Sequence, residues 1–346
     1  MRETARAHIS SMKSHLFIAL SIAATGIIIL GSCKTKQQPP TLAQEESGLN
    51  ITKITDETKG VIQDPTTSYF GGMQGKSRGS GMTWGLVKGL DVSPNGEEIA
   101  YLARMNDQSN VMVRKSAAGA GGAATQRTFR NVGSFSWGSD GKLYFADATN
   151  GQLKICTINA KTGSLMNQLT SNSSDNCPVL SKDGKKLFFT RNEGKNDYSI
   201  WSYDIKTGEL TNCARGFQPE VIPGTNDEFF CVRNSTDGNS EIWRVNFVKG
   251  QETLVLSDRN RGYTSPAISP DGKWLLVVGD TRSTVYDKKN LDIFAVRTDG
   301  SNLIQLTYHP ANDACPQWSA DGQSIYFLSN RANADNSYNI WRMNFR

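Results

Sequence analysis

The hydrophobic positions of this chain follow one pattern that occurs six times between Leu90 and Trp341. Each unit contains a short apolar run, a turn that ends in glycine or asparagine, an aromatic-rich run, a polar loop and another apolar run. The turns are SPNG ending at Gly96, GSDG at Gly141, SKDG at Gly184, PGTN at Asn226, SPDG at Gly272 and SADG at Gly322, which places them 42 to 50 residues apart. Glycine adopts positive φ at little cost and asparagine tolerates it, so we expect each turn to join two antiparallel strands.

Two further strands complete each unit. The runs after the turns, such as KKLFFTRN from Lys185, mix alternation with fully apolar stretches, which is typical of strands buried on both faces. A third run such as SIWSYD from Ser199 and a fourth such as NLIQLT from Asn302 follow. Four antiparallel strands in a period of about 45 residues are typical of a propeller blade. The sequence therefore predicts an all-β, six-bladed β-propeller, with an irregular all-β domain as the alternative.

The N-terminal part of the chain contains a candidate for the missing strand of the last blade. The sixth unit runs only through its third strand before Arg346. Residues 51–55 read ITKIT and match the fourth-strand sequence LIQLT of residues 303–307. We therefore predict that this N-terminal strand completes blade six, closes the ring and begins a propeller domain that spans residues 48–346.

The first 32 residues have the pattern of an export signal. Three basic residues precede an apolar stretch of 15 residues, Leu16 to Leu30, and Leu30-Gly31-Ser32 leads to Cys33. This arrangement resembles the lipobox of bacterial lipoproteins and implies that Cys33 is lipidated and becomes the mature N-terminus. A simple cleavable signal or one membrane anchor is the alternative. Residues 33–47, with two prolines and no apolar periodicity, are expected to be a flexible tether.

Charge and cysteine content exclude several classes of function. Without the signal the chain has 35 basic and 32 acidic residues, a net charge of +3, which argues against nucleic-acid binding. Five cysteines remain after Cys33, and none has the spacing of a metal site or a disulfide framework. Cys177 and Cys315 occupy equivalent positions in blades three and six, which face each other across the ring, so we expect no disulfide between them.

The residues also argue against a recognisable enzyme. His309 is the one histidine beyond the signal, so a histidine-rich metal site is excluded and a Ser-His-Asp triad would depend on this residue. Gly75 to Gly79 fits GxSxG, but no strand precedes it and no helix follows it. We therefore expect no catalytic residues, no metal and no cofactor.

Three features are candidates for ligand or partner binding. A glycine-rich insert, residues 57–86, carries Tyr69, Phe70 and Trp84 on the face where each outer strand connects to the next blade. These aromatic residues either contact a partner or pack against blade one. Asp175 and Asp313 are expected at opposite points of the channel rim, where they either bind a cation or amine or cap the inner strands. His309 lies on the same connection as Asp313, and the same two alternatives, ligand binding or a structural role, apply to it.

The repeats resemble the PD40, or WD40-like, repeat of the TolB family. PAISPDG at 266–272, PQWSADG at 316–322 and PVLSKDG at 178–184 carry the resemblance best, and it extends over residues 88–346. The α/β domain that precedes the propeller in TolB has no counterpart here. The resemblance implies a binding protein of the cell envelope whose partner is an envelope protein, such as the peptidoglycan-associated lipoprotein that TolB binds, or an envelope polymer.

We therefore expect a monomeric, non-enzymatic propeller, anchored through Cys33 to the outer membrane and facing the periplasm, with the cell surface as the alternative location. Lys34 in place of aspartate after the cysteine favours the outer membrane by analogy with lipoprotein sorting. The rival hypothesis is a propeller enzyme or binding protein that acts on a carbohydrate or peptide at the channel mouth.

Overall fold

The computed structural model of this chain describes residues 46, 48–55, 62, 88–105, 107–117, 123–194, 197–282, 289–331 and 337–345. Every described residue belongs to one compact unit, residues 39–346. The predicted export signal, Cys33, Tyr69, Phe70 and Trp84 lie outside the described residues. No helix among the described residues is long and apolar enough to cross a membrane.

The described residues form a six-bladed β-propeller, in which every blade is a four-stranded antiparallel sheet. Blades 1 to 3 consist of β2 Leu90–Val92, β3 Glu98–Met105, β4 Gln108–Lys115 and β5 Thr125–Gln126; β6 Val132–Trp137, β7 Lys142–Asp147, β8 Lys154–Asn159 and β9 Asn167–Gln168; β10 Asp175–Leu180, β11 Lys186–Gly194, β12 Asp197–Asp204 and β13 Leu210–Arg215. Blades 4 to 6 consist of β14 Phe217–Val221, β15 Glu228–Asn234, β16 Ser240–Asn246 and β17 Gln251–Leu256; β18 Tyr263–Ile268, β19 Trp274–Arg282, β20 Lys289–Arg297 and β21 Ile304–Gln305; β22 Asp313–Trp318, β23 Ser324–Ser329, β24 Asn339–Asn344 and β1 Thr52–Lys53. The predicted fold class is confirmed.

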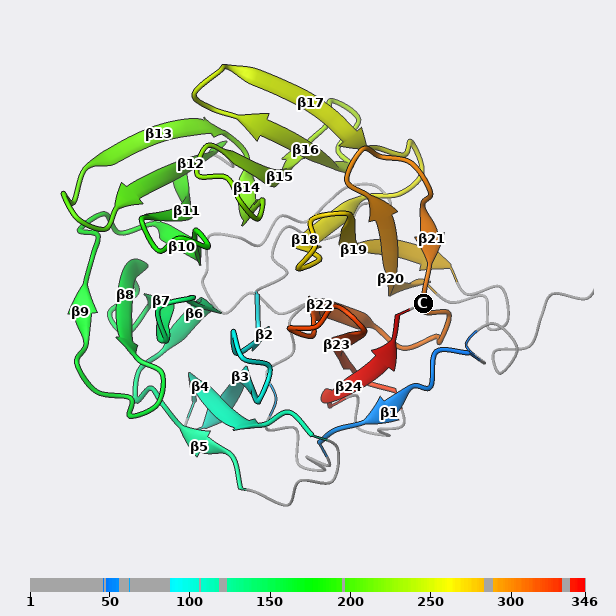
Figure 1. Ribbon diagram of the computed structural model, residues 1–346, viewed down its shortest axis with the longest axis horizontal. Coiled ribbons are helices and arrows are strands. Elements are labelled where there is room, and N and C mark those ends of the chain that lie inside the picture. Colours follow the sequence, from blue (N-terminus) through cyan, green and yellow to red (C-terminus); the bar gives the residue numbers. More distant parts are fainter. Residues whose placement is uncertain are drawn as a thin grey trace, which may run out of the picture. The chain divides into compact units, whose positions relative to one another are not determined.

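Each blade places its first strand at the centre of the ring. Figure 1 shows β2, β6, β10, β14, β18 and β22 around the central channel, whereas β5, β9, β13, β17, β21 and β1 lie at the rim. Inner strands therefore begin at one end of the channel and end at the other. The connections from each outer strand to the next blade lie at the first end, and the six glycine or asparagine turns lie at the second.

A serine side chain, paired with aspartate in three cases and with asparagine in one, builds four of these turns. In SKDG, Ser181 Oγ donates to Asp183 Oδ1 at 2.8 Å and accepts the amide of Lys186 at 3.0 Å, while Gly184 has φ of 75°. The turns that begin at Ser93, Ser269 and Ser319 have the same hydrogen bonds. The Ser-x-Asx-Gly sequence thus satisfies the polar groups of the turn locally and reverses the chain within four residues.

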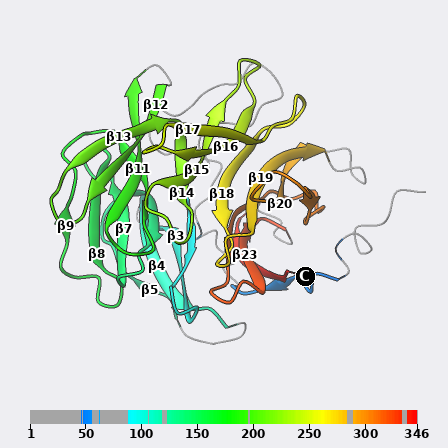
Figure 2. The ribbon, with the colours of Figure 1, turned by 45° about the horizontal axis from the view of Figure 1, so that its top comes forward.

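The hydrophobic core is a ring of clusters between neighbouring blades. One such cluster joins Leu102 and Val111 of blade 1 to Phe135 and Phe145 of blade 2. Five comparable clusters occupy the remaining interfaces around the ring. Figure 2 shows that the sheets of successive blades face one another. Both faces of a blade are therefore covered, so apolar side chains are required on both faces of each sheet.

The N-terminal strand closes the ring as the sequence predicted. Strand β1 pairs antiparallel with β24, with Thr52 opposite Arg342 and Lys53 opposite Trp341. The amide of Ile54 donates to the carbonyl of Ile340 at 2.8 Å and continues the pairing. Blade 6 therefore combines the two ends of the propeller domain, which leaves no blade with a missing outer strand.

Candidate functional site

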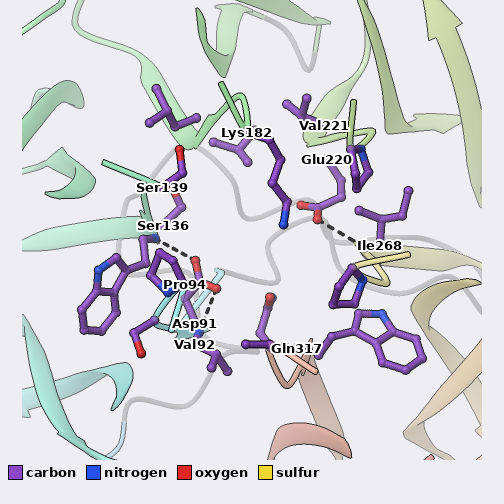
Figure 3. A pocket seen from close by; sticks show the side chains of 18 of the residues that line it. Asp91, Val92, Pro94, Ser136, Ser139, Lys182, Glu220, Val221, Ile268 and Gln317 are labelled. Carbon is purple, nitrogen blue, oxygen red and sulfur yellow. Dashed lines mark hydrogen bonds between the residues drawn. The ribbon is translucent and has the colours of Figure 1, made fainter. Parts of the chain in front are cut away.

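The end of the channel that carries the six turns opens into a cavity of about 190 Å3, here called the channel mouth. All six blades line it with the last residues of the inner strand and the first residues of the turn. Its lining includes Asp91, Ser136, Val179, Glu220, Ile268 and Gln317, one from each inner strand. Figure 3 shows Lys182 and Glu220 projecting into the cavity from one side and Asp91 and Gln317 from the other. Convergence of all six blades makes this cavity the candidate site.

Lys88 connects two acidic residues that lie in different blades. Its Nζ lies 3.5 Å from Asp91 Oδ2 in blade 1 and 4.0 Å from Glu220 Oε2 in blade 4. Burial lowers the pKa of Lys88, but the charges of Asp91 and Glu220 outweigh this effect, and the net shift is upward. Burial also raises the pKa of Glu220, although Lys88 opposes this shift. Lys88 therefore stays protonated and spans the channel between its two carboxylates.

The same two carboxylates fasten neighbouring blades together. Asp91 Oδ2 accepts the amide of Trp137 in blade 2 at 2.8 Å, and Asp91 Oδ1 accepts the amide of Val92 at 2.9 Å. Glu220 Oε1 accepts the amide of Ile268 in blade 5 at 3.2 Å. Both acids thus satisfy backbone donors that would otherwise lie unpaired in the channel wall.

Lys182 supplies a second positive charge at the channel mouth. It lies in the turn after β10, its side chain is exposed, and no ion pair of it is found among the described residues. Figure 3 places its ammonium end beside Glu220, at the open side of the cavity. Because Lys88 already pairs with both acids, Lys182 is the group of the mouth that is best placed to bind an incoming carboxylate.

The channel narrows below the mouth, where four inner strands contain the same irregularity. Cys177, Gln218, Ser265 and Cys315 have φ between 50° and 53°, and each precedes a proline and coincides with a shift of register. Positive φ is uncommon for such residues, and strain of this kind persists only where the surroundings enforce it. They line a cavity of about 30 Å3, enough for roughly one water molecule. The channel mouth therefore has the form of a cup whose walls narrow towards this smaller cavity.

Hydrogen bonds between blades hold these strained residues. The amide of Cys177 donates to Ser134 Oγ of blade 2 at 2.8 Å, and the amide of Gln218 donates to Thr190 Oγ1 of blade 3 at 3.0 Å. The amide of Ser265 donates to Gln218 Oε1 at 2.9 Å. Three of the four irregular strands, β10, β14 and β18, are therefore tied by these bonds to the preceding blade.

The five described cysteines are free thiols. Burial raises the pKa of Cys177 to about 11 and that of Cys231 to about 12. A thiol nucleophile requires a lowered pKa, so these residues are protonated at neutral pH and act as small core or wall residues. No group of three His, Cys, Asp or Glu side chains among the described residues is arranged to hold a metal ion.

Asp175 and Asp313 are both fully buried, each at the start of its inner strand. Asp175 pairs with Arg191 through two contacts, Oδ1 to Nε at 2.6 Å and Oδ2 to Nη2 at 3.0 Å. Asp313 accepts Arg331 Nη2 within blade 6. The two acids thus bind arginines near the ends of the second strands of their own blades, and neither faces the channel mouth.

His309 lies on the connection that precedes β22 and is half-buried. Its Nδ1 accepts the amide of Ala311 at 3.1 Å, and its carbonyl accepts Nδ2 of Asn290 at 2.8 Å. Burial lowers the pKa of His309, and the charge of Arg331 lowers it further. The imidazole is therefore neutral at neutral pH, and its ring nitrogen is used in shaping the loop.

Ile62 is the one described residue of the glycine-rich insert. It is 3% exposed and forms isolated bridges with Ala103 of blade 1 and Tyr338 of blade 6. Ile62 therefore lies between blades 1 and 6. Tyr69, Phe70 and Trp84, the aromatic candidates of the insert, lie outside the described residues.

Comparison of equivalent positions in the six repeats gives information about the channel-mouth acids that inspection of single residues does not. Asp91 and Glu220 each lie two residues before the first hydrogen-bonded residue of the turn, Ser93 and Ile222. When the six repeats are superimposed on the first hydrogen-bonded residue of each turn, which in blade 4 is Ile222 and not the proline of the predicted PGTN turn, that position holds Asp, Ser, Val, Glu, Ala and Gln. The sequence alone therefore marks Asp91 but not Glu220. Charged residues at one wall position of a channel indicate a lining role. Comparison of the repeats does not predict that Lys88 contacts Asp91 and Glu220, because Glu220 lies in a different blade.

Comparison with known proteins identifies the repeats. The family model described as PD40, TolB beta propeller domain, matches residues 89–283. TolB from Acinetobacter baumannii has a similar structure, with a TM-score of 0.58 and 17% identity over 73% of this chain and 65% of that chain. Dipeptidyl-peptidase 5 of Porphyromonas gingivalis is 38% identical over 64 residues, which is 18% of this chain and 9% of that protein.

The uncharacterized peptidase YuxL of Bacillus subtilis is 23% identical over 197 residues, which is 46% of this chain and 30% of that protein. The chain thus spans less than two thirds of the length of each of these relatives. Their likeness supports the fold and the repeat, both of which the sequence predicted.

Proposed function

Since this chain belongs to the PD40 family of TolB β-propeller domains, we propose that it is a lipid-anchored, non-enzymatic binding protein of the bacterial cell envelope. Its channel mouth binds a segment of a partner protein, and Lys182 binds a carboxylate of that segment. The observation that carries this proposal is the cup built by all six blades, in which Lys182 alone among the described charged lining residues has no ion pair.

The geometry of the cup supports binding rather than turnover. Asp91 and Glu220 use their oxygens for backbone amides of the next blade and for Lys88. Such groups position the wall and are poor bases, because protonation or movement breaks contacts between blades. The apolar part of the cup, with Pro94, Pro223 and Pro270 at its edge, offers a preformed surface for a partner side chain.

The partner is best sought among envelope proteins or polymers. The names of the curated relatives, a dipeptidyl-peptidase and an uncharacterized peptidase, favour a peptide over a glycan at this site. The proposed place of the protein follows from the N-terminal sequence, in which Cys33 is lipidated and residues 34–47 tether the propeller to the outer membrane. Replacement of Cys33 by serine should abolish incorporation of an alkyne-labelled fatty acid and release the protein from membranes.

Binding at the mouth can be tested with one charge reversal and a matched control. Once a partner has been identified by crosslinking in intact envelopes, Lys182→Glu should weaken its affinity by about tenfold or more. Lys206→Glu reverses an exposed charge at the β12–β13 turn, away from the channel axis, and should leave the affinity unchanged. Equal affinities of both variants for the partner would exclude the mouth as its binding site.

One observation favours the alternative, turnover of a peptide or carbohydrate at the same mouth. Burial raises the pKa of Glu220, which is a property of catalytic acids. Glu220→Gln keeps the acceptor for the Ile268 amide and removes the titratable group. If the protein hydrolyses or eliminates a peptide or glycan and Glu220→Gln abolishes that activity, the enzyme alternative replaces the binding proposal.

A further inference from the structure

A second cavity lies off the channel axis, between blades 3 and 4, and has a volume of about 250 Å3. We call it the blade 3–4 groove. It is lined by the start of β12, the link from β13 to β14 and the end of β15. Figure 1 shows these two blades as neighbours, with β13 at the rim and β14 at the centre. Because an outer strand connects to an inner strand here, the groove opens at the end of the propeller opposite to the channel mouth.

Gly216 lets the chain approach blade 4 closely at the wall of this groove. Its φ is 131°, and a Cβ at this position would lie 3.0 Å from the carbonyl oxygen of Val232 and 3.1 Å from Sγ of Cys231. A side chain at residue 216 would therefore be strained in its backbone and crowded against blade 4. The rings of Tyr198 and Phe217 pack beside it with their centroids 5.6 Å apart, and Phe217 is half-buried. The groove thus has an aromatic wall next to a site that holds no side chain.

A buried acceptor in the groove has no partner. Asn234 Oδ1 is shielded from solvent and makes no hydrogen bond to any residue that the structure describes. Buried polar atoms are hydrogen-bonded in the great majority of proteins, so an orphan at the wall of a cavity indicates a missing donor. A ligand with an N–H or O–H group in the groove would supply it.

The charges of the groove cancel. Arg233 forms two hydrogen bonds to Glu252, at 2.8 and 2.7 Å, and stacks on Trp243 with its guanidinium carbon 4.9 Å from the ring centroid. Arg215, whose side chain is 85% exposed, contacts Asp197 at 3.2 Å. Arg215 therefore retains donors for a ligand while the groove as a whole is neutral, which favours a neutral ligand over an anion or an amine.

We propose that the blade 3–4 groove binds a neutral saccharide. A hydroxyl group both donates and accepts hydrogen bonds, so neighbouring hydroxyls of a sugar ring can donate to Asn234 Oδ1 and accept from Arg215. The C–H face of the ring packs on Phe217. An added peptide strand fits less well, because Phe217 already pairs with Val232 in the sheet of blade 4. This site is independent of the function proposed for the channel mouth.

Titration of the full chain in detergent micelles tests the proposal. The probes are maltotriose, cellotriose and chitotriose, with trigalacturonate and triglycine as the acidic and the peptide comparison, and binding is measured by chemical shift changes. Asn234→Leu removes the orphan acceptor with little change in volume, and Arg215→Ala removes the exposed donors. Arg244→Ala, which breaks a pair with Glu228 on the outside of blade 4, is the matched control.

The proposal predicts saturable binding of at least one of the three neutral trisaccharides. Asn234→Leu and Arg215→Ala should each weaken that binding by about tenfold, and Arg244→Ala should not. Asn234→Leu should keep or raise the melting temperature, because it replaces an unsatisfied polar atom by an apolar one, so lost binding cannot be attributed to unfolding. The proposal is overturned if no neutral trisaccharide binds, if both groove variants bind as well as the wild type, or if trigalacturonate or triglycine binds more tightly.

Discussion

Thr55 and Asn339, 284 positions apart in the sequence, are joined by a buried hydrogen bond of 2.9 Å from the threonine hydroxyl to the amide oxygen. The same hydroxyl accepts the amide of Ile340 at 2.9 Å. These contacts lie directly after β1, where the two ends of the propeller domain meet. Closure of the ring thus depends on side chains as well as on the short β1–β24 ladder.

Deletion of residues 48–56 should destabilise the whole domain for two reasons. Blade 6 would lose its outer strand, and the core between blades 6 and 1 would lose the side chain of Ile54. Thr55→Val should cost about 1–3 kcal/mol, since it leaves the buried amide of Ile340 without an acceptor. Thermal unfolding measures both effects. If the deletion variant melts at the wild-type temperature, β1 does not close the ring.

Buried ion pairs at the starts of β10 and β22 should contribute strongly to stability. Asp175→Ala or Arg191→Met alone should cost about 3–5 kcal/mol, because either change leaves an uncompensated buried charge. The double variant should cost less than the sum. Arg104→Met, which breaks the exposed pair with Asp107, is the control and should cost at most about 1 kcal/mol. Chemical denaturation of the four variants measures these differences, and additive costs of Asp175→Ala and Arg191→Met would contradict the pairing.

The contribution of one buried carboxyl, Asp292, to stability should fall as pH rises from about 4 to 8. Burial, and then the charge of Asp313, raises the pKa of Asp292 to about 8. The folded state therefore holds a proton that the unfolded state, with a pKa near 3.9, releases, and this contribution decreases between these two values. Asp292→Asn should raise the melting temperature at pH 8 relative to the wild type and change it less at pH 4. If Asp292→Asn changes the melting temperature equally at pH 4 and pH 8, the pKa of Asp292 is not raised in the folded state.

The serine that begins four of the six turns should stabilise its blade by a measurable amount. Ser269 Oγ donates to Asp271 at 2.6 Å and accepts the amide of Trp274 at 2.9 Å, and this hydroxyl, with the amide of Lys273, lowers the pKa of Asp271. Ser269→Ala should cost about 1 kcal/mol. Ser257→Ala, an exposed position after β17, should be neutral. Thermal unfolding distinguishes the two, and equal melting temperatures would assign the turn to Gly272 alone.

The fold was readable from the sequence because its determinants are local and repeated. Each Ser-x-Asx-Gly turn satisfies its own hydrogen bonds, and the match of ITKIT to LIQLT located the closing strand. The inner-strand irregularities were also marked, since Cys177, Gln218, Ser265 and Cys315 all precede proline, but their positive φ depends on hydrogen bonds from neighbouring blades.

The candidate site was less accessible to sequence reasoning because it depends on distances across the ring. Asp175 and Asp313 were expected at opposite points of the channel rim, and the structure buries both at the first positions of β10 and β22. Their arginine partners are set by antiparallel register, with Asp175 opposite Arg191. The contact of Lys88 with Glu220 joins blades 1 and 4 across the channel, and no local pattern reports such a distance.

The central claim, that a partner segment binds in the channel mouth, is tested most directly by site-specific photocrosslinking in intact cell envelopes. A photoreactive residue at Ser139, in the exposed turn of the mouth, is compared with one at Thr253 on the exposed outer strand of blade 4. Our account predicts that Ser139 captures one defined envelope protein, that Thr253 does not, and that Lys182→Glu abolishes the capture. Capture of the same protein with equal yield from Thr253, or from Ser139 with the Lys182→Glu variant, would contradict it.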